Sequence, residues 1–127
     1  MLRHCDDILI LAKSFCQKFG NTNMRPENAE SDFKLLSPSS KSEMGDYNPG
    51  TPTIHRYFCQ TCGVHVLSEG SYEWEGQSYD HFTVNAATID QPQDGIDLRD
   101  VTLQYFDGLH DNWNGGLQDK PWSGGMV

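Results

Sequence analysis

The spacing of apolar residues divides the chain into an amphipathic start, a polar middle and a strand-rich second half. Over residues 6–19, apolar side chains recur at intervals of three and four, which predicts one N-terminal helix. These side chains are Ile8, Leu11, Ala12, Phe15 and Phe19. Asp6 or Asp7 can cap the start of this helix, and Gly20 can close it.

Residues 21–52 are polar and rich in proline and serine, and only the short patch at residues 33–36 is apolar. This composition predicts mostly loop over 21–52.

The second half alternates β-branched and aromatic residues with polar ones, which is typical of strands. Strands are expected at 53–58, 64–67, 79–85 and 101–106, separated by turns at Glu69-Gly70, Glu75-Gly76 and residues 93–95. The first two strands form a hairpin with Cys59 and Cys62 at its tip. The tail, 107–127, is predicted to be irregular, with its tryptophans packed back on the sheet.

Composition limits the size of the core. Leu, Ile, Val and Phe make up about a fifth of the 127 residues, whereas aromatic residues make up 11% and there are 12 glycines. We expect a single, small, turn-rich and mainly β domain over residues 1–127. Because its core is small, we expect an additional cross-link, such as a bound metal ion or a disulfide, to stabilise it.

The charge and the N-terminal sequence limit the expected cellular location and partners of the protein. The apolar run at 8–12 is too short for a signal peptide or a bilayer span, and Asp6 and Asp7 stand where a signal peptide carries positive charge. We therefore expect a reducing, cytoplasmic location, where cysteine pairs favour metal or redox chemistry over disulfides. A net charge of −9 argues against nucleic acid and anionic membranes as partners.

The strongest chemical signal is the sequence from Phe58 to Gly63, which reads Phe-Cys-Gln-Thr-Cys-Gly. Two thiolates separated by two residues in a tight turn can face one ion, as in a zinc knuckle. Gly63 permits the positive φ that such a turn often needs. A thioredoxin-like redox pair, which normally precedes a helix, and two ordinary buried cysteines are the alternatives.

A structural zinc ion takes four ligands, so Cys59 and Cys62 need two more. Cys5 and Cys16 are candidates, but in a continuous helix their eleven-residue separation places them roughly 16 Å apart along the axis. Histidine could substitute for cysteine, although a lone histidine is more often hydrogen-bonded than metal-bound. The histidines are His4, His55, His65, His81 and His110.

Several segments in order resemble the glutathione-dependent formaldehyde-activating enzyme family, also called the centromere protein V/GFA domain. The knuckle at 58–63 and the following Val-Asn-Ala-Ala-Thr-Ile-Asp at 84–90 resemble its C-terminal half. Residues 33–37 resemble the segment between its zinc motifs, and residues 16–19 the end of its catalytic cysteine motif.

This resemblance implies an Mss-four-like fold of twisted antiparallel sheets with two Zn²⁺ sites. Cys59 and Cys62 would be structural ligands, and Cys5 and Cys16 would be remnants of the catalytic cluster. The implied activity is that of a carbon–sulfur lyase, which combines formaldehyde and the thiol glutathione into S-hydroxymethylglutathione. Zinc could activate the thiol sulfur and polarise the aldehyde.

The chain departs from the family pattern at its start. An early Cys-x-Cys pair is absent, Arg3 stands where the first catalytic cysteine is expected, and ten residues separate Cys5 from Cys16 instead of two. Removal of residues 8–15 would restore that spacing, so we expect an N-terminal truncation and an insertion at 8–15. A non-catalytic zinc-binding structural or interaction module of the same fold is therefore the alternative function.

Other polar and aromatic groups receive simpler interpretations. Tyr72, Trp74 and Tyr79 are expected to pack within a hairpin. The acidic series at Asp90, Asp94, Asp97 and Asp100 is expected to form a solvated face, because it lacks the oxygen spacing of a calcium loop.

Overall fold

The computed structural model describes residues 7–11, 22–48, 50 and 52–124. Within these residues, eight strands form one sheet in the order β3-β4-β5-β6-β2-β1-β7-β8. The strands are β1 (Asp7–Leu11), β2 (Asn23–Met24), β3 (Gly45–Asp46), β4 (Ile54–Phe58), β5 (His65–Trp74), β6 (Gln77–Asn85), β7 (Thr102–Asp107) and β8 (Asn112–Gln118). The predicted mainly β class is confirmed, and every strand pair except β1–β7 is antiparallel.

Helical structure among the described residues is limited to single turns. They are α2 (Ala29–Asp32), η1 (Lys41–Glu43) and η2 (Ala86–Thr88). Asn28 caps α2, since its side chain accepts hydrogen bonds from the backbone N–H groups of Glu30 and Ser31. The region 21–52, predicted to be mostly loop, therefore also contributes α2, η1 and the two-residue strands β2 and β3 to the fold.

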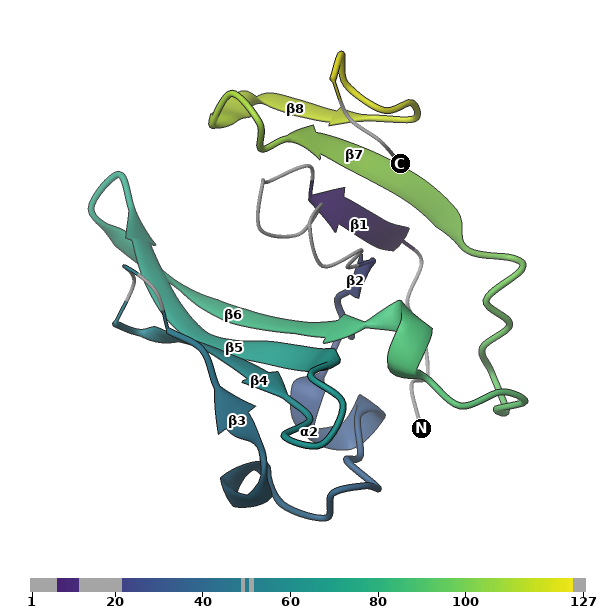
Figure 1. Ribbon diagram of the computed structural model, residues 1–127. Helices are drawn as coiled ribbons and strands as arrows, with labels where there is room; N and C mark the ends of the chain where they lie inside the picture. Colours follow the sequence, from purple (N-terminus) through teal and green to yellow (C-terminus); the bar gives the residue numbers. More distant parts are fainter. Residues whose placement is uncertain (1–6, 12–21, 49, 51, 125–127) are drawn as a thin grey trace.

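The sheet bends so that β3, β4, β5 and β6 form one side of the molecule and β2, β1, β7 and β8 the other (Figure 1). The long β5–β6 hairpin extends beyond its neighbours and turns at Glu75 and Gly76, both at positive φ, as the Glu-Gly pair predicts. Tyr72 and Tyr79 stack across this hairpin with ring centroids 5.6 Å apart, which confirms their predicted packing.

The helix predicted over 6–19 is wrong for residues 7–11. Their backbone forms β1, which pairs antiparallel with β2 and parallel with β7. A continuous apolar run of this length suits a central strand as well as a helix, and parallel pairing favours such runs. The remainder of the predicted helix, residue 6 and residues 12–19, lies outside the described residues.

Two further expectations are wrong. Residues 112–118 of the predicted irregular tail form β8, which pairs with β7, although Trp122 does pack back: its Nε1 donates to the carbonyl oxygen of Tyr105 at 3.1 Å. Gly70, predicted to lie in a turn, lies inside β5 opposite Ile54 and His81.

The core is small, as the composition implies. Met24, Leu67 and Val84 are the largest fully buried side chains among the described residues. Met24 also packs with Ala86 and Ile96, and four partly buried side chains surround this cluster. They are Phe33, Ile89, Leu98 and Val101. The irregular segment after η2 is thereby fixed to the sheet by apolar contacts.

Candidate metal centre

The turn that carries Cys59 and Cys62 connects β4 to β5, as predicted. Its backbone is closed by two hydrogen bonds: Cys59 N–H donates to the Val64 carbonyl at 2.9 Å, and Gly63 N–H donates to the Cys59 carbonyl at 2.8 Å. Gly63 has φ +76, a conformation that strongly favours glycine. The turn therefore has the tight form that a metal knuckle requires.

The two thiols differ in their surroundings. Cys59 is half-buried, Cys62 is exposed, and both are free. Hydrogen bonds from the backbone N–H groups of Cys62 and Thr61, followed by one from the Cys62 side chain, lower the pKa of Cys59 below its usual value. Each of these donors favours the thiolate over the thiol. Because thiolate is the form that ligates metal, the turn fits a zinc ion at these two sulfurs.

Further ligands are not assembled within the described part of the chain. No group of three or more His, Cys, Asp or Glu side chains suited to a metal ion is found there. Cys5, Cys16 and His4, all considered as ligands from the sequence, lie outside the described residues. The structure thus brings Cys59 and Cys62 together and leaves the positions of Cys5 and Cys16 open.

The four described histidines have other contacts. His55 Nδ1 lies 2.6 Å from Asp46 Oδ2, and His110 Nδ1 lies 2.8 Å from Asp107 Oδ1. The remaining two are His65, whose Nε2 lies 3.0 Å from Ser68 Oγ, and His81, whose ring meets the edge of Tyr72. These contacts agree with the general expectation that lone histidines are hydrogen-bonded or packed.

His65 is buried at the start of β5, beside the cysteine turn. Burial, with a smaller contribution from the positive charge of Arg56, lowers the pKa of His65 to about 4. In the unfolded chain its pKa is about 6.5, so below that pH the unfolded state binds a proton that the folded state takes up only near pH 4.

We therefore expect the free energy of unfolding to decrease as the pH falls from about 6.5 to about 4, with a slope from this residue of up to about 1.4 kcal/mol per pH unit. Urea denaturation of wild type and H65Q at pH 7, 6, 5 and 4 measures it. The stability difference between the two proteins should shift in favour of H65Q on acidification. A difference independent of pH would show that His65 binds its proton equally in the folded and unfolded states, which would contradict its burial as a neutral imidazole.

A second cluster of charged groups lies where β3, β4 and β5 meet. Lys41 Nζ lies 2.6 and 2.7 Å from the two carboxylate oxygens of Glu69 and 5.9 Å from the ring centroid of Tyr57. Tyr57 stacks on His55, and burial together with Glu69 and Asp46 raises the pKa of Tyr57. The ion pairs Lys41–Glu69 and His55–Asp46 are partly exposed, so each adds little to the stability of the fold.

Comparison with models of known protein families, with curated proteins and with solved structures found no match for this chain. Among residues 7–11, 22–48, 50 and 52–124, no helix has the length and apolar character that crossing a bilayer requires.

Proposed function

We propose that this chain is a zinc-binding domain of the formaldehyde-activating type, with carbon–sulfur lyase activity on a glutathione adduct in the cytoplasm. The observation that carries the zinc assignment is the cysteine turn. Two sulfurs, a positive-φ glycine and backbone N–H groups directed at Cys59 provide the elements of half a structural zinc site. The proposal includes an Mss-four-like arrangement of the sheet.

The lyase assignment rests on the order of the family-like segments. Residues 16–19, 33–37, 58–63 and 84–90 follow one another as in the formaldehyde-activating family. The knuckle-like segment forms a hairpin turn, and Asn85 ends β6 directly before η2, where its side chain accepts a hydrogen bond from Ala87 N–H.

The reaction joins a thiol to an aldehyde. A bond forms between the glutathione sulfur and the carbonyl carbon of formaldehyde, the carbonyl π bond breaks, and the thiol proton ends on the resulting hydroxyl oxygen. Bound zinc would supply Lewis acidity and stabilise a thiolate. In this proposal Cys59 and Cys62 hold the structural ion, and Cys5 and Cys16 contribute to the catalytic one.

A non-catalytic zinc-binding module of the same fold is the second candidate. Arg3 in place of a cysteine favours it, because a catalytic cluster short of one thiolate binds its ion less tightly. Under this alternative the cysteine turn would still hold zinc.

Zinc binding is tested by elemental analysis of the purified protein. We expect at most about one zinc per chain, because each of the two family-like sites lacks ligands. The C59S/C62S variant should lose this zinc, whereas T61S, which keeps both sulfurs and the backbone N–H groups, should retain it. Zinc retained in C59S/C62S would contradict the assignment of zinc to the cysteine turn, and two tightly bound zinc ions in the wild type would contradict the expectation that both sites lack ligands.

The lyase activity is tested by glutathione-dependent consumption of formaldehyde, with C5S/C16S as the control. A zinc-dependent rate above that of C5S/C16S would support the enzyme. A wild-type rate equal to the control, in protein that still binds zinc through Cys59 and Cys62, would instead favour the non-catalytic module.

A further inference from the structure

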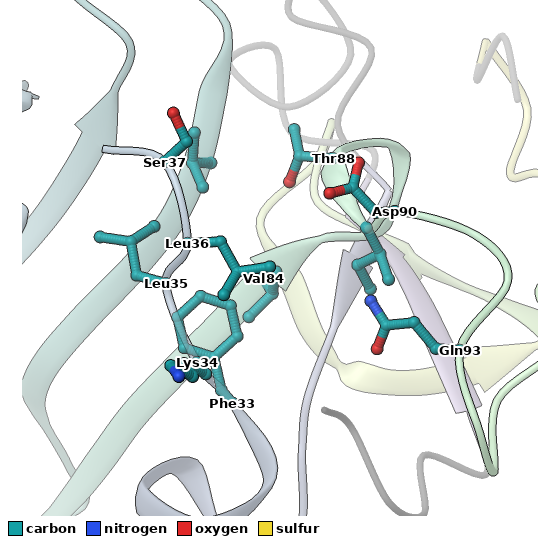
Figure 2. A pocket seen from close by; sticks show the side chains of 11 residues that line it. Phe33, Lys34, Leu35, Leu36, Ser37, Val84, Thr88, Asp90 and Gln93 are labelled. Carbon is teal, nitrogen blue, oxygen red and sulfur yellow. The ribbon is translucent and has the colours of Figure 1, made fainter. Parts of the chain in front are cut away.

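Two regions outside the cysteine turn have features that the proposed function does not use. The first is a cavity of about 230 Å³ between the segment after α2 and the end of β6. Figure 2 shows Phe33 and Val84 on one side of this cavity and Asp90 and Gln93 on the other. Because Lys34 and Asp90 give its lining both signs of charge, the cavity favours no single class of ligand. The second region is the strand β8, whose sequence and pairing together favour one defined reaction.

β8 is paired with β7 only at its two ends. Asn112 is opposite Asp107 and Leu117 is opposite Phe106, so two neighbouring residues of β7 are matched by residues five positions apart in β8. Residues 113–116 therefore form a bulge with which no residue of β7 pairs. Among the described strands, β8 is also the last in the sheet, so the bulge lies at its outer edge (Figure 1).

The bulge contains Asn114 and Gly115, the only Asn-Gly pair in the sequence. Both residues are exposed, and the side chain of Asn114 has no hydrogen bond or ion pair with any described residue. Trp113, directly before them, is anchored, since its ring packs on that of Phe106 with centroids 5.6 Å apart. The fold thus holds Asn114 at the surface without fixing its side chain.

An asparagine followed by glycine is a reactive pair, because the next backbone nitrogen can attack the side-chain carbonyl carbon. A side chain on that next residue hinders the approach, and glycine has none. A Cβ at Gly115 would overlap the end of the Asn112 side chain, so the structure favours glycine here for a second reason. Asn85 shows the opposite case: its side chain is buried and held by hydrogen bonds to the His65 carbonyl and the Ala87 N–H.

We propose that Asn114 is a site of spontaneous deamidation. The backbone nitrogen of Gly115 forms a bond to Cγ of Asn114, and the Cγ–Nδ2 bond breaks. The backbone proton passes through water to the departing Nδ2, which leaves as ammonia. Water then opens the cyclic imide at either of its carbonyl groups, which gives aspartate or isoaspartate. No electron is transferred, and water is the only co-reactant.

The modified protein should keep its fold. Isoaspartate adds one carbon to the backbone, and either product adds one negative charge to the net charge of −9. Because residues 113–116 have no partners in β7, the added carbon need not shift the pairs Asp107–Asn112 and Phe106–Leu117. The site shares no residue with the cysteine turn, so the proposal does not depend on zinc or on the lyase activity.

The reaction is followed by mass spectrometry of the wild-type protein incubated at pH 8 and 37 °C. Fragment ions of one peptide report both Asn114 and Asn112, which is exposed on the same strand but followed by tryptophan. We expect Asn114 to convert at least about tenfold faster than Asn112. Aspartate and isoaspartate should both form, because direct hydrolysis of the side chain would give aspartate alone.

Two variants test the role of each residue of the pair. G115A places a methyl group beside the attacking nitrogen and should slow conversion at least about tenfold. Alanine suits the backbone there, since Gly115 lies outside the left-handed region. N114Q keeps a side-chain amide but lengthens it by one methylene, so closure of the ring is disfavoured and the product should not form at this position. Circular dichroism confirms that each variant is folded.

The contribution of the bulge is measured by comparing the folded protein with the chain unfolded in urea. We expect folding to slow the conversion of Asn114 by less than about tenfold, because residues without strand partners need no local unfolding to react. A larger reduction on folding, similar rates at Asn112 and Asn114, aspartate without isoaspartate, or an undiminished rate in folded G115A would each overturn the proposal.

Discussion

Replacement of Gly70 by alanine is expected to lower the free energy of unfolding by about 3 kcal/mol or more. Gly70 has φ +141, which side-chain-bearing residues rarely adopt, and a Cβ at this position would overlap the carbonyl group of Thr53. The chain before β4 is fixed there, because Ser71 N–H donates to the Thr53 carbonyl at 3.2 Å and Thr53 Oγ1 donates to the Ser71 carbonyl at 2.5 Å. Guanidinium denaturation measures the loss.

Gly76 supplies the matched control for G70A. It has φ +78 at the tip of the β5–β6 hairpin, and a Cβ there would meet no atom within 4 Å. G76A therefore carries only the cost of the backbone conformation, about 1 kcal/mol. If G70A and G76A lost similar stability, the close approach of Thr53 to Gly70 would not exist in solution.

Truncation of Leu67 to alanine is expected to cost about 3 kcal/mol, because Leu67 is completely buried and the space left by the removed methyl groups cannot be refilled. Leu67 stands in the middle of the sheet, opposite Tyr57 on β4 and Val84 on β6. In a chain with so few large aliphatic residues, one such side chain carries a large share of the core. The loss is measured as the shift in urea denaturation.

The control for L67A is L117A. Leu117 lies on the edge strand β8 and is 42% exposed, so its truncation should change stability by only about 0.5 kcal/mol. A loss for L117A as large as that for L67A would mean that β8 is covered by something beyond this chain, or that the core does not centre on β5 and β6.

The sequence predicted three of the strands well, whereas β5 continues seven residues beyond its predicted end at residue 67. Strands β4, β6 and β7 lie within two residues of their predicted ends, because β-branched and aromatic residues alternate with polar ones there and glycine turns separate them. The Glu75-Gly76 turn was predicted for the same reason. In contrast, Glu69-Gly70 has the same two residue types but lies inside β5. Glycine is needed there because the Thr53 carbonyl comes close to it, which the local sequence does not indicate.

The wrong predictions, for residues 7–11 and for β8, result from contacts with other strands of the sheet. The run at residues 7–11 becomes a strand because β2 and β7 provide partners on both sides, and local periodicity carries no information about those partners. β8 contains Asn112, Gly115 and Gly116, which individually disfavour strands, yet pairing with β7 orders it.

Features of the candidate site regions also differ in whether the local sequence predicts them. The cysteine turn could be predicted, because a metal knuckle is a local motif whose spacing fixes its geometry. The burial of the Gln93 side-chain oxygen could not, because nothing in the surrounding sequence indicates that Gln93 lies near a segment about 60 residues earlier in the chain.

The parallel pair β1–β7 has a consequence for how the domain forms. Ile8 is opposite Leu103, so 94 residues lie between the two partners in the sequence, whereas β4, β5 and β6 are joined by short turns. On the ribosome the β4–β5–β6 hairpins can assemble early, but β1 can pair with β7 only when almost the entire chain has been made. Because β1 stands between β2 and β7, synthesis that stops before residue 102 would leave it without its parallel partner and expose an open strand edge to other chains.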